Sequence, residues 1–447
     1  MQQRKGIRVI LFPLPLQGHI NPMIQLANIL YSKGFSISVI HTNFNSLNSS
    51  KYPHFTFNSI PDGLLESEAS TEDAILLSIL NFKCAEPFRN CLAKLFLDVL
   101  EEPIACLIPD VVCCFAKPVA EGLELPTIVL RTTSVCSFPG FAAFPLLLDN
   151  GDLPIQKVCI FMAFSPVLAC RLEEPVQVLQ PLKVKDIPEI KTSKPEGLHE
   201  LINRMVKQAK ASSGIIWNSF EELEQDDELT TLGKDFPVPI FPIGPFHQYF
   251  PASSSSLLTQ DQSCISWLDT QVPNSALYVS FGIIAAINEA EFQEIAWGLA
   301  NSKQPFLWVV RPGLALGSEW LEPLPDGFLE MIRGRGRIVK WAPQQEVLAR
   351  PAIGGFWTHN GWDSTLESLC EGVPLICQPN FGDQMNWNTF REKTGEREYR
   401  KCNKRLMVEA EGQELRMRTL NLKDKADLCL REKGSSCQNL ENLINYI

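Results

Sequence analysis

The chain has 447 residues, 45% of them hydrophobic, and this length is typical of two or three domains with sizeable cores. Its formal net charge of −11 argues against a nucleic-acid-binding or anionic-membrane-binding surface. Fourteen cysteines are scattered without a C-x-x-C spacing, so we expect free thiols in a reducing, cytoplasmic environment. No apolar run is long enough for a membrane span, and Pro13 and Pro15 interrupt the first apolar stretch, which favours a strand over a signal peptide.

The first forty residues predict a β-α-β unit. Residues 8–12 form a buried apolar strand. Asn21 and Pro22 resemble a helix start, because asparagine can cap and proline suits the first helical position. Apolar residues at helical spacing then run to Gly34, and residues 35–42 form the next strand. This order predicts a parallel sheet with a right-handed crossover.

The same alternation of strands and helices continues along the chain. Further strands are expected at 105–110, 127–132, 213–220, 276–281, 305–310, 337–341, 354–359 and 374–379. Prolines and serines dominate 236–262, where periodicity disappears and a linker is expected. We therefore expect an α/β protein with two Rossmann-like domains, 1–235 and 263–447, facing across a cleft, with ligands at the carboxyl ends of the strands. The last helix is expected to pack back on the first domain.

A candidate proton-transfer pair follows two of these strands. His19 is expected in the loop after the first strand, and Asp110 ends the strand at 105–110. A carboxylate on one imidazole nitrogen fixes the tautomer and lets the other nitrogen take a proton near neutral pH. Each residue also has an ordinary explanation, His19 as a loop histidine bonded to backbone and Asp110 as a turn residue or helix cap. Together they are a candidate general base and its partner.

A candidate anion site lies in the second half. A strand is expected to end at His359, and a helix to begin near Ser364, which forms an S-x-x-E capping pattern with Glu367. The N–H groups and the dipole at such a helix start favour a phosphate, and His359 lies just before it. Trp341 offers a flat face to a base, or is simply a core tryptophan.

Other cofactor motifs are absent from the sequence. It has no P-loop, no G-x-G-x-x-G after a strand and no G-x-S-x-G elbow. It also has no D-x-D and no H-x₃-H pair, so neutralisation of a phosphate falls to the helix start and His359. We therefore expect neither a metal ion nor a resident cofactor.

Residues 341–384, WAPQQEVLARPAIGGFWTHNGWDSTLESLCEGVPLICQPNFGDQ, resemble the signature box of plant UDP-dependent glycosyltransferases. PLQGHINP near the start, IPD at 108–110 and YVSFG at 278–282 match other motifs of this family, and the resemblance covers almost the whole chain. It is strongest to the branch that glycosylates small metabolites such as terpenoids and flavonoids. The resemblance implies the glycosyltransferase B fold, with the acceptor held by the first domain and the UDP-sugar co-substrate by the second.

The resemblance also assigns roles residue by residue. It implies that His19 is the general base of an inverting transfer and Asp110 its partner, and that a final glutamine of the box marks glucose as the sugar. It implies that Trp341 stacks on uracil, that Ala342 and Gln344 bind the edge of the base, and that Glu367 binds the ribose. It further implies that the diphosphate is bound by His359, Asp363 and Ser364, and the sugar by Trp362, Asp383, Gln384 and Thr132.

The chain departs from the family pattern at several places. Asp363 stands where the family has asparagine; as an N-cap it is equally good, but it cannot donate to a diphosphate. Ile283 stands where the family has serine or threonine, and Arg350 replaces a common histidine at an expected surface position. The segment 385–404 is short and poorly periodic, so a loosely packed edge is expected.

Two functions therefore stay open from the sequence. One is an active, metal-independent glucosyltransferase that modifies a hydroxyl or carboxyl group of a hydrophobic small plant metabolite. The other is a nearly inactive or non-catalytic relative with an impaired diphosphate site. In both, the expected partners are a UDP-sugar and a small-molecule acceptor, with no nucleic acid, no membrane span and a monomeric state.

Overall fold

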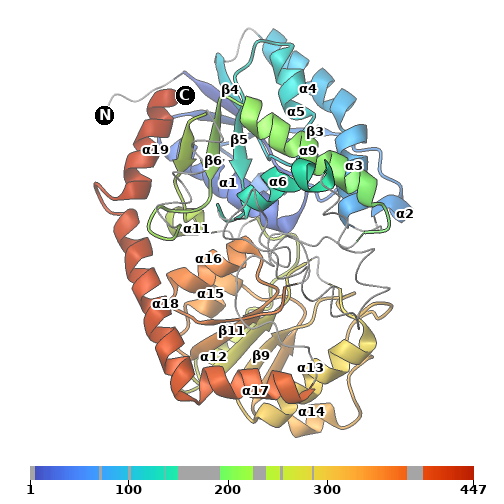
Figure 1. Ribbon diagram of the computed structural model, residues 1–447, viewed down its shortest axis with the longest axis vertical. Coiled ribbons are helices and arrows are strands. Elements are labelled where there is room, and N and C mark those ends of the chain that lie inside the picture. The colour runs from blue at the N-terminus through green and yellow to red at the C-terminus, as the bar shows by residue number, and fades with distance from the viewer. Residues whose placement is uncertain are drawn as a thin grey trace. The chain divides into compact units, whose positions relative to one another are not determined.

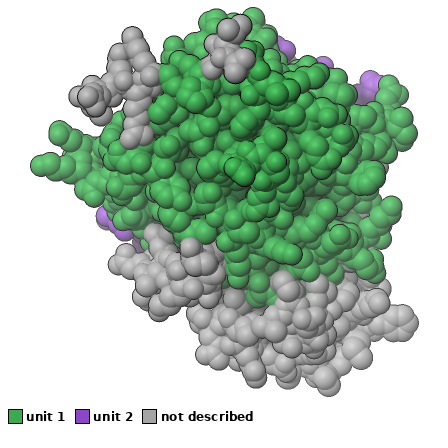
Figure 2. All heavy atoms as spheres, turned by 90° about the horizontal axis from the view of Figure 1, so that it is seen from above, with its two compact units in different colours: residues 1–257, 381–386, 429–447 green, residues 258–380, 387–428 purple. Residues whose placement is uncertain are grey.

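The computed structural model describes residues 6–69, 73–98, 102–135, 137–149, 192–224, 238–251, 255–283, 286–379 and 396–447 (Figure 1). These residues fall into two compact units, coloured separately in Figure 2. Unit 1 contains the described residues up to 257 and those from 429 onward. Unit 2 contains the described residues between 258 and 428.

The core of unit 1 is a parallel sheet. Its strands are β1 (Arg8–Phe12), β2 (Ser36–Thr42), β3 (Thr56–Ile60), β4 (Ile104–Pro109), β5 (Ile128–Arg131), β6 (Gly214–Trp217) and β7 (Ile240–Pro242). They pair in the order β3-β2-β1-β4 and β5-β6-β7, and two parallel bridges, Leu107–Thr127 and Asp110–Leu130, join β4 to β5. Every residue of β1 is buried, as its continuous apolar run predicts for a central parallel strand.

Helices of unit 1 cover this sheet. They are α1 (Gln17–Ser32), α2 (Glu66–Ala69), α3 (Asp73–Lys83), α4 (Ala85–Leu97), α5 (Ala116–Glu121), α6 (Phe138–Asp149), α9 (Pro195–Ala211), α11 (Phe246–Tyr249) and α19 (Ser435–Tyr446), with one 3-10 turn, η1 (Ser49–Lys51). The apolar face of α1 packs with β1, β2 and α19 in one core cluster that includes Leu26, Val39 and Leu443. Burial of such faces supplies most of the helices' stability.

Unit 2 repeats the design with a five-stranded parallel sheet. Its strands are β8 (Ala276–Ser280), β9 (Phe306–Val309), β10 (Gly336–Val339), β11 (Ile353–Thr358) and β12 (Leu375–Cys377), in the order β10-β9-β8-β11-β12. Its helices are α12 (Ser263–Leu268), α13 (Glu289–Ser302), α14 (Phe328–Met331), α15 (Gln344–Leu348), α16 (Trp362–Cys370), α17 (Glu396–Met407) and α18, which runs on to the boundary (Ala410–Cys429). Leu406 of α17 is buried in the core with Trp357, whereas Asn403 is fully buried and its amide has no hydrogen-bond partner among the described residues.

Each sheet has a point at which the strand order reverses. In unit 1 the chain runs outward from β1 to β3 on one side and from β4 to β7 on the other, so the reversal lies between β1 and β4. In unit 2 the corresponding reversal lies between β8 and β11. Loops that leave two adjacent strands at such a point diverge and open a crevice at their carboxyl ends, which is where ligands of these sheets bind.

The α/β class and the parallel sheets are as expected from the sequence, but two strands were missed. Both β3 and β7 are edge strands, and β7 lies within the proline-rich segment 236–262. An edge strand tolerates proline because one of its sides makes no hydrogen bonds to another strand. The prolines around β7 therefore made the sequence resemble a linker instead of a strand. The boundary between the units falls between Leu257 and Leu258, and α19 packs on β7.

Candidate functional site

The reversal point of unit 1 brings His19 and Asp110 together. Asp110 follows β4 directly, and its backbone N–H donates to the carbonyl of Phe12 at the end of β1 (2.9 Å). Its Oδ2 lies 2.7 Å from Nδ1 of His19. The Asp110 side chain is fully buried, whereas His19 is 23% exposed. A carboxylate accepts only, so Nδ1 carries the proton and Nε2 carries the lone pair that can take one.

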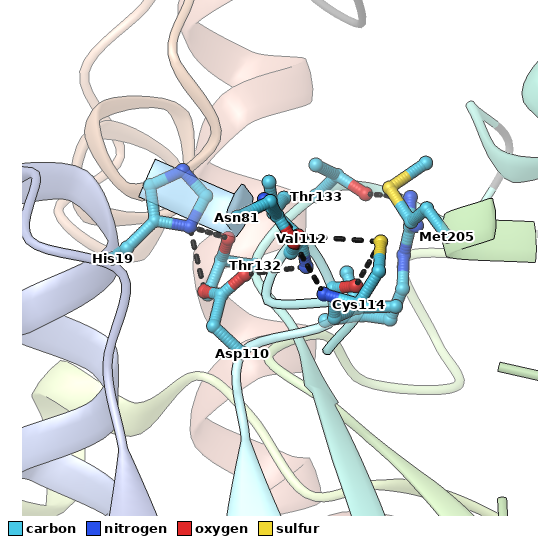
Figure 3. A network of polar contacts seen from close by, with 10 residues as sticks. His19, Asn81, Asp110, Val112, Cys114, Thr132, Thr133 and Met205 are labelled. Atoms are coloured by element: carbon cyan, nitrogen blue, oxygen red, sulfur yellow. Dashed lines mark hydrogen bonds and ion pairs between the residues drawn. The ribbon is translucent and has the colours of Figure 1, made fainter. Parts of the chain in front are cut away.

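Thr132 joins this pair from the next strand. It follows β5, and its Oγ1 lies 3.2 Å from Nδ1 of His19 (Figure 3). The adjacent Thr133 is fixed from two sides, because Trp217 Nε1 donates to its carbonyl (2.6 Å) and Arg131 donates to its hydroxyl (2.8 Å). Three residues that the sequence assigned to the site thus converge at one place in unit 1.

The start of the first helix differs from the sequence prediction. α1 begins at Gln17, and the N–H groups of His19 and Ile20 both donate to the carbonyl of Leu16. His19 therefore lies in the first turn of the helix and not in a preceding loop. Asn21 is not the cap, because its Oδ1 accepts a hydrogen bond from Ser255 Oγ (2.7 Å), and Pro22 lies inside the helix. A proline near the start of a helix removes only one backbone hydrogen bond, so the helix can begin several residues before it. The Asn-Pro pair was therefore a misleading signal for the helix start.

The reversal point of unit 2 places His359 between two glycines. His359 follows β11, and Gly282 follows β8 with a φ of +69°. An added Cβ on Gly282 would lie 2.6 Å from Cε1 of His359, and one on Gly361 would lie 2.5 Å from its Nε2. Only glycine allows this close approach from both sides. Burial lowers the pKa of His359 to about 4, and the positive charge of Arg311 acts in the same direction.

Asp363 does not cap α16. The helix begins at Trp362 with Gly361 as its N-cap, and Asp363 lies in the first turn, half-buried. The expected start near Ser364 and the Ser364–Glu367 capping box are therefore wrong, because Gly361 reaches the extended cap conformation (φ −61°, ψ 143°) without a side chain. A carboxylate in the first turn still interacts favourably with the helix dipole.

Glu367 is buried and bonded to two amide side chains. Nε2 of Gln344 donates to its Oε2 (2.7 Å), and Nε2 of Gln345 donates to its Oε1 (2.7 Å). Gln344 also donates to Ser364 Oγ (3.0 Å) and accepts from the Tyr278 hydroxyl (3.3 Å). Burial raises the pKa of Glu367, and the two amide hydrogen bonds oppose that shift. Glu367, Gln344 and Ser364 thus form one polar cluster at the start of α15 and α16.

Other residues assigned from the sequence also belong to unit 2. Trp341 follows β10, is partly buried, and packs against a core cluster with Ala342, which is 4% exposed. Trp362 is buried at the first position of α16. Ile283 is half-buried beside Gly282 and carries no donor. Asp383 and Gln384 lie outside the described residues.

The sequence prediction missed some supporting residues. Gln345 is one, and Arg311 is another, because its Nε donates to the carbonyl of Gly282 (3.1 Å) and holds that loop. Gln378 also links two elements, accepting from Trp357 Nε1 (3.1 Å) and donating to Glu291 (2.7 Å). The only sequence signal of Arg311 and Gln378 was a polar residue at the end of an apolar strand, and Gln345, inside α15, gave none.

The surroundings add three facts. Arg350 lies at the surface beside Asp269 (3.5 Å). Within the described ranges, no group of three or more His, Cys, Asp or Glu side chains is placed to hold a metal ion, and no disulfide occurs. No helix in the part of the chain that the structure describes is long and apolar enough to cross a membrane.

Comparisons with known proteins show what the whole chain is similar to. The family model of UDP-glucoronosyl and UDP-glucosyl transferase matches residues 230–404. UDP-glycosyltransferase 76B1 of Arabidopsis thaliana is 49% identical over 98% of this chain and 97% of its own. Flavonol 3-O-glucosyltransferase UGT76E12 of the same plant is 40% identical over 100% of this chain and 98% of its own. The solved structure of Phytolacca americana UGT2 with UDP-2fluoro-glucose and pterostilbene matches 98% of this chain and 99% of its own chain, with a TM-score of 0.79 and 26% sequence identity.

Proposed function

Because the chain belongs to the plant UDP-glycosyltransferase family of enzymes, with its glycosyltransferase B fold, we propose that it transfers glucose from UDP-glucose to a hydrophobic small plant metabolite. The acceptor class we propose is a terpenoid or flavonoid-like compound with a reactive hydroxyl or carboxyl group. A flavonol glucosyltransferase among the relatives and a pterostilbene complex among the similar structures support this choice. We propose that it acts as a monomer.

The proposed chemistry begins at His19. Nδ1–H donates to Asp110, so Nε2 takes the proton of the acceptor hydroxyl while the acceptor oxygen attacks the anomeric carbon. UDP leaves from the opposite face of the sugar, which inverts the α-linkage to a β-glycoside. The buried Asp110 carboxylate stabilises the imidazolium that forms. Thr132, next to His19, is proposed to contact the sugar.

The proposed donor residues lie in unit 2. We propose that uracil stacks on Trp341 and that the carboxylate of Glu367 accepts hydrogen bonds from the ribose. Glu367 already accepts two amide hydrogen bonds, so binding of a ribose exchanges one set of donors for another. The first turn of α16, with His359 beside it, is proposed to hold the diphosphate, whose charge grows as the bond to the sugar breaks.

This scheme requires no metal ion, because the N-terminus of α16 is proposed to hold the diphosphate. Initial rates measured after extensive treatment with EDTA should equal those of untreated enzyme. Loss of transfer on chelation, with recovery on addition of Mg²⁺ or Mn²⁺, would show that a metal takes part.

The single observation that carries the proposal is the 2.7 Å contact between His19 Nδ1 and Asp110 Oδ2. We predict that His19→Ala lowers the rate of transfer by about 10²- to 10⁴-fold, the usual contribution of a general base. UDP affinity should stay within about twofold by calorimetry, since the proposed donor residues belong to unit 2. His54→Ala, which changes an exposed histidine of the same unit, is the matched control. A His19→Ala variant that keeps the parent rate would exclude this role.

A second candidate is a nearly inactive or non-catalytic relative. It is favoured by the first turn of α16, where Asp363 brings a negative charge, and by Ile283, which offers no donor. His359 is neutral at pH 7 because burial lowers its pKa to about 4, so it does not offset the carboxylate. Calorimetry with UDP separates the candidates, because an active enzyme binds UDP and the second candidate binds it weakly or not at all.

A further inference from the structure

The turn that carries Asp110 is clamped by a buried asparagine from a different element. Asn81 lies near the end of α3 and is 4% exposed. Its Oδ1 accepts a hydrogen bond from the backbone N–H of Cys114 (2.9 Å), and its Nδ2 donates to the carbonyl of Val112 (3.0 Å). The same Nδ2 also donates to the carbonyl of Leu77 one turn earlier (3.0 Å). One side chain thus joins α3 to both ends of a three-residue segment (Figure 3).

This segment is directly coupled to the Asp110 carboxylate. The N–H of Val112 donates to Oδ1 of Asp110 (2.9 Å), while Oδ2 contacts His19. Asn81 therefore holds the carbonyl side of Val112 and Asp110 holds its N–H side. A shift of Val112 would rotate the carboxylate away from the imidazole, and a displacement near 1 Å at a reacting group can lower a rate by about a hundredfold.

Simple packing does not explain an asparagine at this position. Leu76 and Leu80 on α3 are buried apolar residues, and an amide beside them loses its hydration. Such a group is tolerated when it is hydrogen-bonded, and here the amide makes three hydrogen bonds to backbone atoms. Two of these atoms, the N–H of Cys114 and the carbonyl of Val112, also bond each other (2.9 Å), so the amide adds a second set of bonds to the same turn. The asparagine is therefore matched to the backbone of the Asp110 turn and not to the helix alone.

We propose that Asn81 is a positioning residue for the His19–Asp110 pair. It does not contact substrate. It fixes the turn at 110–114 so that the Asp110 carboxylate stays in line with Nδ1 of His19 and selects the tautomer in which Nε2 accepts a proton. This inference rests on the proposed function for its effect on turnover, but its structural part, the tautomer of His19, is independent of any activity.

Asn81→Ala is the principal test, and Ser78→Ala is its control. The Ala variant removes all three hydrogen bonds. Ser78 lies on the same helix and donates only to the carbonyl of Ala74 (3.0 Å), so its replacement removes a local bond without touching the turn. Asn81→Ser, which keeps a small donor and acceptor, takes the place of the Ala variant where circular dichroism shows that the Ala variant is unfolded.

We expect kcat of the Asn81 variants to fall by about ten- to a hundredfold. The KM for UDP-glucose and the Kd for UDP should stay within about twofold, since all the proposed donor-binding residues except Thr132 lie in unit 2. Ser78→Ala should keep the parent kcat. A folded Asn81 variant with a kcat within about twofold of the parent would overturn the proposal.

The tautomer of His19 supplies a readout that a purely structural role would not move. The chain has six histidines, so ¹³Cδ2-labelled histidine gives a simple spectrum in which His19→Asn identifies the signal of His19. At about pH 8.5, where ordinary histidines are neutral, the parent should show the Nδ1–H form and the Asn81 variants a mixture with Nε2–H. Unchanged Nδ1–H in a folded Asn81 variant would refute positioning. A parent that binds no UDP and transfers no sugar would instead refute the proposed function and leave this measurement valid.

Discussion

Replacement of Asp363 by asparagine tests whether the first turn of α16 is impaired for anion binding. The change keeps the size of the side chain and removes one negative charge from a half-buried position directly after the first residue of the helix. His359, which precedes the first turn of α16, is neutral at pH 7 because burial lowers its pKa to about 4. The carboxylate of Asp363 therefore faces no compensating imidazolium.

The substitution should have opposite effects on the free and the UDP-bound protein. Without ligand, loss of a carboxylate near a helix N-terminus should lower the free energy of unfolding by about 0.3–1 kcal/mol. With UDP, an amide that donates to a charged phosphate contributes about 1.5–3 kcal/mol. Since about 1.4 kcal/mol is a tenfold change in affinity, we expect UDP to bind about ten- to a hundredfold more tightly.

The assay combines calorimetry with UDP, thermal unfolding with and without UDP, and initial rates with UDP-glucose at fixed pH and salt. Glu289→Gln is the matched control, because Glu289 is an exposed carboxylate in the first turn of α13. It should reproduce the small loss of stability and leave UDP affinity unchanged. Ile283→Ser, which adds a hydroxyl beside Gly282, should improve affinity further but not additively, since both changes serve one anion.

One result would refute the reasoning about Asp363. If Asp363→Asn changes neither UDP affinity nor rate, the carboxylate does not oppose the diphosphate. The carboxylate would then either point away from the diphosphate or be offset by another group.

Two further changes probe the same loops. Gly282→Ala should weaken UDP binding by at least about tenfold, because the added Cβ would displace His359. Gly334→Ala is its control, because Gly334 has a φ of +83° and no neighbour within 4 Å, so the change should add only a backbone strain of about 1 kcal/mol. Equal UDP affinities of the two variants in calorimetry would contradict this prediction. His359→Gln should flatten the acid side of the stability profile. The pKa of His359 in the folded protein is about 4, below its ordinary value of 6.5, so His359 contributes stability above pH 6.5 that is lost as the pH falls towards 4. In urea titrations over this pH range, the free energy of unfolding of the parent should therefore fall by about 3 kcal/mol more than that of the variant. Identical slopes for the two proteins would show that His359 is accessible to protons when folded.

The central strands and the His19–Asp110 pair could be predicted from the sequence because their signals are local. β1 is a short apolar stretch followed by Pro13, Asp110 stands directly after β4, and His19 lies seven residues after the end of β1. Adjacent parallel strands bring their carboxyl ends together, so two residues 91 positions apart in the sequence could be placed side by side. The contact of His19 with Asp110 and Thr132 agrees with that expectation.

The helix starts and the supporting shell could not be predicted, because they depend on tertiary contacts. Asn21 has the composition of a cap, but its side chain bonds Ser255, which is distant in the sequence. Asp363 likewise fits a capping pattern, yet Gly361 takes the cap position because only glycine fits against His359. Asn81 gave no signal, since a single polar residue on an apolar helix face does not reveal which backbone atoms it meets.

The order of elements along the chain has a consequence for synthesis on the ribosome. β7 is an edge strand of unit 1, and α19, the last helix of the chain, packs against it. Tyr446 donates to the carbonyl of Ser213 (2.5 Å), and Leu440 and Leu443 are buried in the core beside β1 and β2. Unit 1 therefore cannot complete its core until α19 has been made, after the described residues of unit 2, although most of its strands emerge first. Unit 2 is made and can fold while the edge of β7 is still uncovered, so the nascent chain exposes an unpaired strand edge during this interval, the kind of surface that chaperones protect from aggregation.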